Sequence, residues 1–331
     1  MQLTKSFITI GYCSHRVETL NSMNQLMKEH DVIITEEAQN PCFIDMLNKK
    51  ISIKEYIREE HLEFPEFSQR YYIILRSLHR NGKVILQIEP FIERLMQIYE
   101  MFSDGKKPKD IMKIPLLKSV YEVEKKTTAA LLNFYESSLK DSFPQVIKKV
   151  IKFARADAER FRIRDSMRAE AVVQIITKKP TENKKVYIEA GGIHIFLEKM
   201  LRQKMKKKCY IRSVNLMEPV IKKLTGQSSL LPPGDLLTIN YILKKSKNEP
   251  FEKLQAGRSL IYIKLLKKDE MLPTREIEAP HIEDEIKVIG LVSNLPLKQC
   301  EELYKKIRFQ KRKEALVTIK AYHESATKTH P

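Results

Sequence analysis

The sequence predicts an α/β protein with a mixed, mostly parallel sheet, a large helical insertion and a C-terminal α/β extension. Short apolar runs rich in β-branched residues, typical of buried strands, occupy 7–11, 31–37 and 83–89. Segments with helical periodicity separate these runs, which favours parallel strands joined by right-handed crossovers. Residues 91–178 show helical patterns throughout, which predicts an insertion between strands.

The composition is that of a folded chain with a basic surface. The 331 residues are 42% hydrophobic and 31% charged, enough for one large or two medium domains. We expect an α/β core over residues 1–234 and a basic extension over 235–331. The net charge of +18 favours an anionic substrate or partner, but lysine and arginine are spread over the whole length. Nucleic acid is therefore a less favoured partner.

The cysteines and the N-terminus indicate a cytoplasmic protein. Four cysteines lie far apart without a CxxC pair, which argues against a zinc knuckle or a disulfide framework. The chain has no signal-peptide pattern and no apolar run near the roughly 20 residues of a membrane span, so no membrane partner is expected. Only 9 glycines occur, with no Walker A or GxGxxG motif. The oligomeric state is left open.

The first strand–helix–strand unit organises the candidate site. The run from Phe7 reaches Gly11, where we expect the backbone to turn, and His15 follows at the rim of the sheet. A helix over 17–29 leads to the second strand, which ends in Glu36 and Glu37. Since parallel strands end at the same edge, His15 is expected to face one of these glutamates.

Helices and one strand follow in the middle of the chain. Residues 43–78 are expected to be helical, with a break or a helix start at Pro65. The third strand ends in Glu89, which gives three strand ends with a histidine or glutamate. Three helices are then predicted, over 91–102, 116–139 and 142–176.

The third of these helices carries charges on its apolar stripe. Asp157, Arg164, Asp165 and Arg168 lie within or beside the stripe, and a buried charge costs several kcal/mol unless it is paired. One interpretation is a structural Arg–Asp network that closes the helix onto the sheet. The other is an arginine that points into a pocket. Periodicity alone favours the structural network.

The later part of the chain repeats the strand-to-histidine pattern. A strand from Lys184 ends in Gly191–Gly192, followed by His194 and a helix over 195–207. A short strand is expected over 208–213. Further strands are expected over 260–266 and 286–292, and a basic amphipathic helix over 297–322.

The candidate catalytic residues are therefore His15, Glu36, Glu37, Arg164 and His194. An imidazole with a pKa near 6.5 suits a general base at neutral pH, oriented by a carboxylate. The set His15, Glu37 and His194 is equally suited to a divalent metal ion that activates water. The residue types alone do not distinguish general-base catalysis from metal binding. A Cys13–His15 nucleophile pair is less favoured, because small buried cysteines are common.

Four short motifs together resemble the erythromycin esterase-like and ChaN-like superfamily, which includes TraB and Tiki proteins. They are Gly11-Tyr-Cys-Ser-His15, Val32-Ile-Ile-Thr-Glu-Glu-Ala38, Arg164-Asp-Ser-Met-Arg-Ala-Glu170 and Lys185-Val-Tyr-Ile-Glu-Ala-Gly-Gly-Ile-His194. The resemblance covers about residues 5–215. It implies a polar pocket above an α/β sheet, with His15 as the base for water in esterase-like members. It also implies metal-dependent proteolysis in Tiki-like members and haem binding in ChaN-like members.

Two functions follow as hypotheses. The first is a hydrolase, of peptidase or esterase type, in which His15 activates water with or without a divalent metal and acts on a small molecule or peptide. Arg164 would then stabilise negative charge, and His194 would be a second base or ligand. The alternative is a non-catalytic binding protein for an anionic ligand, haem or nucleic acid.

Overall fold

The computed structural model describes residues 6–60, 64–177, 184–205, 209–246 and 248–328. The chain forms two compact units that alternate along the sequence. Unit 1 comprises Met1–Glu122, Phe161–Lys222 and Glu270–Glu278. Unit 2 comprises Val123–Arg160, Lys223–Asp269 and Ala279–Pro331. The division of the sequence at residue 234 stays a prediction.

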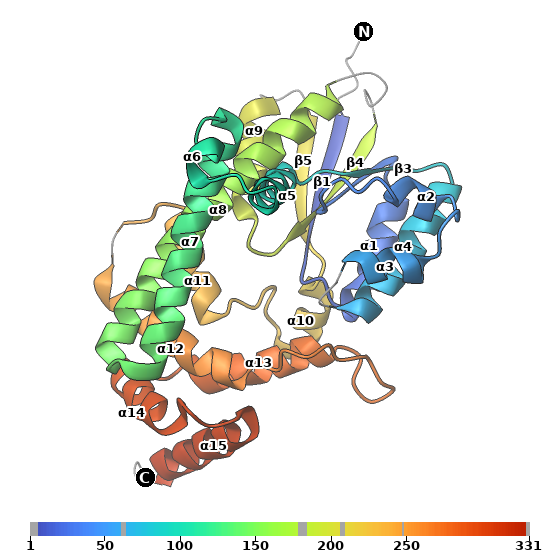
Figure 1. The fold of residues 1–331 in the computed structure, drawn as a ribbon. Helices are drawn as coiled ribbons and strands as arrows, with labels where there is room; N and C mark the ends of the chain where they lie inside the picture. Colours follow the sequence, from blue (N-terminus) through green and yellow to red (C-terminus); the bar gives the residue numbers. More distant parts are fainter. Residues whose placement is uncertain (1–5, 61–63, 178–183, 206–208, 247, 329–331) are drawn as a thin grey trace. The chain divides into compact units, whose positions relative to one another are not determined.

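Unit 1 contains a five-stranded parallel sheet, which confirms the α/β fold (Figure 1). All strand pairs are parallel, so the sheet of the described residues is not mixed. The strand order is β3-β2-β4-β1-β5. The strands are β1 (Ser6–Cys13), β2 (Val32–Thr35), β3 (Val84–Gln87), β4 (Lys185–Gly191) and β5 (Cys209–Asn215).

Strand β4 lies between β1 and β2, although it follows them by about 150 residues of sequence. Gly11 of β1 pairs with Glu189 of β4, and Ile34 of β2 pairs with Ile188. The first and second strands are therefore parallel but not neighbours. Because parallel strands end at one edge, this order inserts the end of β4 between His15 and Glu36.

Alternate strand residues face two helical layers. Ile8, Ile10 and Ile188 pack with the long insertion helix and the helix after β4, while Ile33 and Tyr187 pack with the helices between β1 and β3. The first layer holds α8 (Phe143–Ile176) and α9 (Ile195–Met205). The second layer holds α1 (Leu20–Lys28), α2 (Phe43–Leu47), α3 (Ile53–Glu60) and α4 (Pro65–Arg80), with a short 3-10 helix at Val17–Thr19.

Gly11 does not turn the chain at the end of the first strand, as the sequence predicted. The strand continues through Gly11 to Cys13, and the turn comes at His15, whose φ is +50°. A Cβ on Gly11 would overlap the ring of Tyr187 from the neighbouring strand. Glycine is required there for the close approach of that ring, and not for a turn.

The predicted helical insertion is confirmed over its described residues. Before α8, the insertion contains α5 (Pro90–Ser103), α6 (Pro108–Ile111) and α7 (Pro115–Lys140). Of the two roles expected for Pro65, a break or a helix start, the structure shows the helix start, because α4 begins at this residue. Helix α10 (Glu218–Thr225) follows β5. The predicted helix over 195–207 ends at Met205, and residues 206–207 lie outside the described part of the chain.

Unit 2 is helical in its described residues, so the strands predicted over 260–266 and 286–292 are wrong. Both segments belong to helices that bury Leu260, Ile261, Val288 and Val292 in the core of this unit. A short apolar run has no periodicity that distinguishes a strand from a buried helix. The helices are α11 (Pro233–Ile242), α12 (Glu249–Leu265), α13 (Pro280–Val292), α14 (Leu297–Ile307) and α15 (Arg312–Lys328).

The basic helix predicted over 297–322 is two helices, α14 and α15, separated by residues 308–311. A search of the described helices for one both long and apolar enough to cross a bilayer found none.

Candidate functional site

The carboxyl edge of the sheet gathers charged side chains from five elements, four strands and α8. His15 follows β1, Glu36 and Glu37 follow β2, and Glu89 follows β3. Strand β4 supplies Glu189 and leads to His194, while α8 supplies Arg164, Asp165 and Arg168. The site has two halves, one on each face of the sheet.

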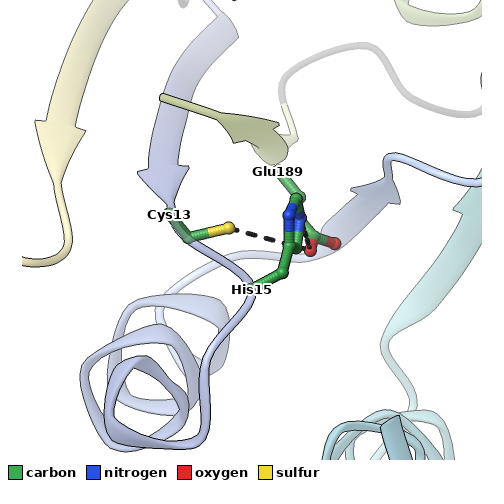
Figure 2. A group of neighbouring side chains, drawn as sticks. All are labelled: Cys13, His15 and Glu189. Atoms are coloured by element: carbon green, nitrogen blue, oxygen red, sulfur yellow. Dashed lines mark hydrogen bonds and ion pairs between the residues drawn. The ribbon is translucent and has the colours of Figure 1, made fainter. Parts of the chain in front are cut away.

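The first half is built around His15 and Glu189. Figure 2 shows His15, Glu189 and Cys13 pointing toward one another from the ends of β1 and β4. His15 Nε2 lies 3.0 Å from Glu189 Oε1, and the Cys13 thiol contacts the same oxygen at 4.0 Å. The side chain of His15 is 35% exposed and that of Glu189 only 3%. His15 is thus the member of the trio that solvent can reach.

Helix α4 packs against this half of the site and contacts both Glu189 and His15. The hydroxyl of Tyr71 donates a short hydrogen bond to the second oxygen of Glu189. Phe67, one turn earlier on α4, stacks on Tyr71 and meets the His15 ring edge-on at a centroid distance of 5.9 Å. Both oxygens of Glu189 are therefore engaged, and its carboxylate is fixed in one orientation.

The protonation of the trio follows from its burial and its mutual contacts. Burial lowers the pKa of His15, but the neighbouring Cys13 and Glu189 raise it by more, and the resulting pKa lies well above the ordinary 6.5. Burial also raises the pKa of the Cys13 thiol, which His15 partly offsets. The raised pKa favours the protonated form of His15, which donates to Glu189.

The second half is built around His194, which two carboxylates hold. Its Nδ1 lies 2.5 Å from Asp165 Oδ1, and its Nε2 lies 2.9 Å from Glu36 Oε1. Burial lowers the pKa of His194, while Glu36 and Asp165 together raise it to about 9. The ring is buried and both its nitrogens are occupied. His194 in this state is a cation that fixes Glu36, and not a base.

Glu36 is the anion at the centre of the second half. Arg164 donates to its Oε1 at 2.8 Å, and the backbone N–H of Gly191 donates to its Oε2 at 2.5 Å. Burial raises the pKa of Glu36, but His194, Arg168 and Arg164 lower it well below 4.5. Arg164 also contacts Glu89 at 3.2 Å.

Arg168 closes α8 onto the ends of three strands. Its guanidinium is fully buried and donates to the carbonyls of Ile88 at 3.0 Å, Thr35 at 3.1 Å and Glu189 at 2.7 Å. Arg164, Asp165 and Arg168 of the apolar stripe thus form a paired network that attaches α8 to the sheet, whereas Asp157 pairs with Arg160 of the same helix. The residues of this network contact glutamates, a histidine and backbone carbonyls that lie outside the stripe.

The two halves meet at Gly191. The point where a Cβ on Gly191 would lie is within 4 Å of His15 Cε1, His194 Cδ2 and Glu36 Oε2. The structure therefore brings together His15, Glu36, Arg164 and His194, as their positions at strand ends and on the helix suggested. A larger residue at 191 would fill the space between the two histidines.

Glu37 lies in a different set of contacts. Its oxygens accept from the Tyr72 hydroxyl at 2.7 Å and from the Gln87 amide at 3.0 Å. The Thr35 hydroxyl lies 3.4 Å from the same carboxylate. The metal set expected from the sequence, His15, Glu37 and His194, stays a prediction.

The donors that converge are Cys13, His15 and Glu189. One ligand atom from each lies within 4.8 Å of the other two, so these residues fit a single metal ion. Glu189, Tyr71 and Asp165 are site residues that the sequence reasoning did not select. The signal for Glu189 was a lone charge inside the apolar strand Val186–Ala190, and the signal for Asp165 was its place on an apolar stripe.

The chain is similar in sequence to an archaeal protein. It is 30% identical over 295 residues to a protein of Archaeoglobus fulgidus described as uncharacterized, a match that covers 89% of this chain and 97% of the other. The chain belongs to the same family as that protein. No family model and no solved structure matches the sequence.

Proposed function

We propose that the protein is a metal-dependent hydrolase whose centre is Cys13, His15 and Glu189. The observation that carries this proposal is the convergence of three metal-type donors on the solvent-accessible His15. A divalent cation held there would lower the pKa of a water molecule and so supply a nucleophile at neutral pH. Thiolate, imidazole and carboxylate together are ligands typical of zinc.

The raised pKa of His15 favours this version over metal-free base catalysis. A histidine that is protonated at neutral pH is a poor general base, and Glu189 stabilises its proton. Metal binding requires a neutral imidazole and releases that proton. The carboxylate of Glu189, oriented by Tyr71, is then free to bind the cation.

The second half of the site places three cations against three carboxylates. Arg164, Arg168 and protonated His194 contact Glu36, Glu89 and Asp165, and Arg164 keeps 20% of its side chain exposed. Fixed cations of this kind stabilise negative charge that develops on a substrate. We assign this role to Arg164 and a positioning role to His194 and Asp165.

The substrate class rests on the sequence resemblance. Similarity of the strand-end motifs to the Tiki and erythromycin esterase-like proteins makes peptides and esters the first substrates to test. A cytoplasmic location belongs to the same proposal, because the four cysteines are unpaired thiols.

The test is elemental analysis of the purified protein together with hydrolysis assays on peptides and esters. We expect one divalent ion per chain, loss of the ion in His15→Ala, and loss of hydrolysis by at least about a hundredfold in the same variant. His79→Ala, which changes a half-buried histidine of α4, is the matched control.

Two other results would change the conclusion. Hydrolysis that persists in the metal-free protein would contradict the metal-dependent version. A bound ion without turnover on any substrate would support the alternative, a non-catalytic binding protein.

A further inference from the structure

The corner between α14 and α15 carries a dense cluster of positive charge. Residues 303–313, here called the α14–α15 corner, read Leu-Tyr-Lys-Lys-Ile-Arg-Phe-Gln-Lys-Arg-Lys and contain six basic residues and no acidic one. Blocks of this kind are typical of surfaces that bind polyanions.

The two arginines of the corner have structural roles within unit 2. Arg308 donates to the carbonyls of Ser138 and Asp141 at the end of α7. Arg312 donates to the Leu265 carbonyl at 2.6 Å and pairs with Asp284 at 2.5 Å. These contacts fix the corner to its unit. Because the arginines are engaged in them, the lysines carry the charge that a ligand can reach.

The four lysines of the corner are exposed. Lys305 pairs with Glu301 of the same helix at 2.8 Å, and Lys306 lies 5.4 Å from the Tyr322 ring centroid. For Lys311 and Lys313, the described part of the chain offers no acidic side chain at ion-pair distance. Lys306, Lys311 and Lys313 therefore present charge that is in no ion pair among the described residues, whereas Lys305 is paired.

Phe309 projects from the middle of these lysines. Its side chain is 72% exposed, the largest fraction among the large hydrophobic residues that the structure describes. The Arg308 guanidinium lies 4.9 Å from the ring centroid, which leaves most of the ring in solvent. The other apolar residues of the corner, Leu303, Tyr304 and Ile307, are buried in the core of the unit. Phe309 thus adds nothing to that core.

We propose that the α14–α15 corner binds single-stranded nucleic acid, with a base stacked on Phe309 and phosphates bound by Lys306, Lys311 and Lys313. An exposed aromatic ring among basic residues matches both parts of a nucleotide, since every base has a face that stacks and every phosphate is an anion. A duplex keeps its bases paired and would use the lysines alone. A lipid surface calls for several exposed apolar residues, and the corner exposes only Phe309. The corner belongs to unit 2, whereas the residues of the proposed hydrolase centre belong to unit 1.

The experiment measures fluorescence anisotropy of a labelled oligothymidylate of about 15 nucleotides with the full-length protein over a range of salt concentrations. Phe309→Ala should weaken binding by about tenfold without a change in salt dependence, because stacking involves no counterion release. Lys306→Gln/Lys311→Gln/Lys313→Gln should weaken binding and lower the slope of log affinity against log salt by about two.

The control variants separate this corner from the general basic charge of the protein. Lys106→Gln/Lys107→Gln/Lys109→Gln removes the same charge from an exposed segment of unit 1, and Val317→Ala changes a residue of α15 that is 69% exposed. Both should bind the oligonucleotide as the unaltered protein does. Circular dichroism checks that each variant is folded.

Three results would overturn the proposal. Equal losses in the two lysine variants would mean that the whole basic surface attracts polyanions without a site. Equal affinity of Phe309→Ala and the unaltered protein for the oligonucleotide would show that no base stacks on Phe309. Binding to phosphatidylglycerol vesicles with no binding to the oligonucleotide would assign the corner to a lipid surface instead.

Discussion

Asp165 Oδ1 lies 2.5 Å from His194 Nδ1, and this contact ties the middle of α8 to the turn after β4. The other ring nitrogen of His194 meets Glu36 at the end of β2. One buried imidazolium therefore joins a helix and two strand ends. Such a group links the stability of the fold to pH.

The first prediction concerns the free energy of unfolding at alkaline pH. The folded pKa of His194 is about 9, above its ordinary 6.5, so its stabilising contribution is complete below about pH 6.5 and is lost as pH rises through about 9. The contribution is on the order of 3 kcal/mol. Urea unfolding of the unaltered protein should show this fall in the free energy of unfolding between about pH 7 and pH 10.

Asp165→Asn provides the comparison for this prediction. The substitution removes one of the two anions that raise the pKa of His194, so the fall at alkaline pH should become smaller. His79→Gln, at a half-buried position on α4 outside the site, should keep the fall of the unaltered protein. If Asp165→Asn keeps the same alkaline fall, His194 is not its source.

The second prediction compares Gly11 of β1 with Gly192 in the turn after β4. Gly11→Ala should lower the free energy of unfolding by about 1–3 kcal/mol, because its Cβ would overlap the Tyr187 ring in a fully buried position. Gly192→Ala should have almost no effect, since no atom lies within 4 Å of its Cβ. Urea unfolding measures both. Equal effects of the two substitutions would show that Tyr187 does not pack against Gly11.

The strand ends could be predicted from the sequence because their apolar runs stop at polar residues. Glu36 and His194 each follow such a run, and parallel strands must end at one edge of the sheet. The partner of His15 could not be predicted, because strand order is set by contacts between distant segments. The insertion of β4 beside β1 places Glu189 against His15.

The helices of unit 2 show a second limit of sequence reasoning. The run Leu260-Ile-Tyr-Ile is rich in β-branched and aromatic residues, which favours a strand locally. In the structure it lies inside the 17-residue helix α12, where Leu260, Ile261 and Leu265 enter one core. Burial on several sides removes the alternation of polar and apolar residues that would identify the helix.

The third prediction distinguishes the two sets of metal ligands. Glu189→Gln should reduce the affinity for zinc by at least about tenfold, because it removes an anionic donor of the converging trio. Glu37→Gln should change it much less, since Glu37 accepts from Tyr72 and Gln87. Competition with a chromophoric chelator measures both affinities. A larger loss in Glu37→Gln would favour the set His15, Glu37 and His194.

The fourth prediction concerns Arg168, whose guanidinium is fully buried and bonded to three strand-end carbonyls. Arg168→Lys keeps the charge, but an ammonium group cannot reproduce the planar fork that reaches Ile88, Thr35 and Glu189 together. Each buried carbonyl left without a donor costs about 1–3 kcal/mol, so we expect a loss of several kcal/mol in the free energy of unfolding. Arg70→Lys, on the half-exposed side of α4, should cost less than about 0.5 kcal/mol. Urea unfolding of the two variants decides the matter, and a loss for Arg168→Lys as small as that for Arg70→Lys would mean that charge alone holds α8 on the sheet.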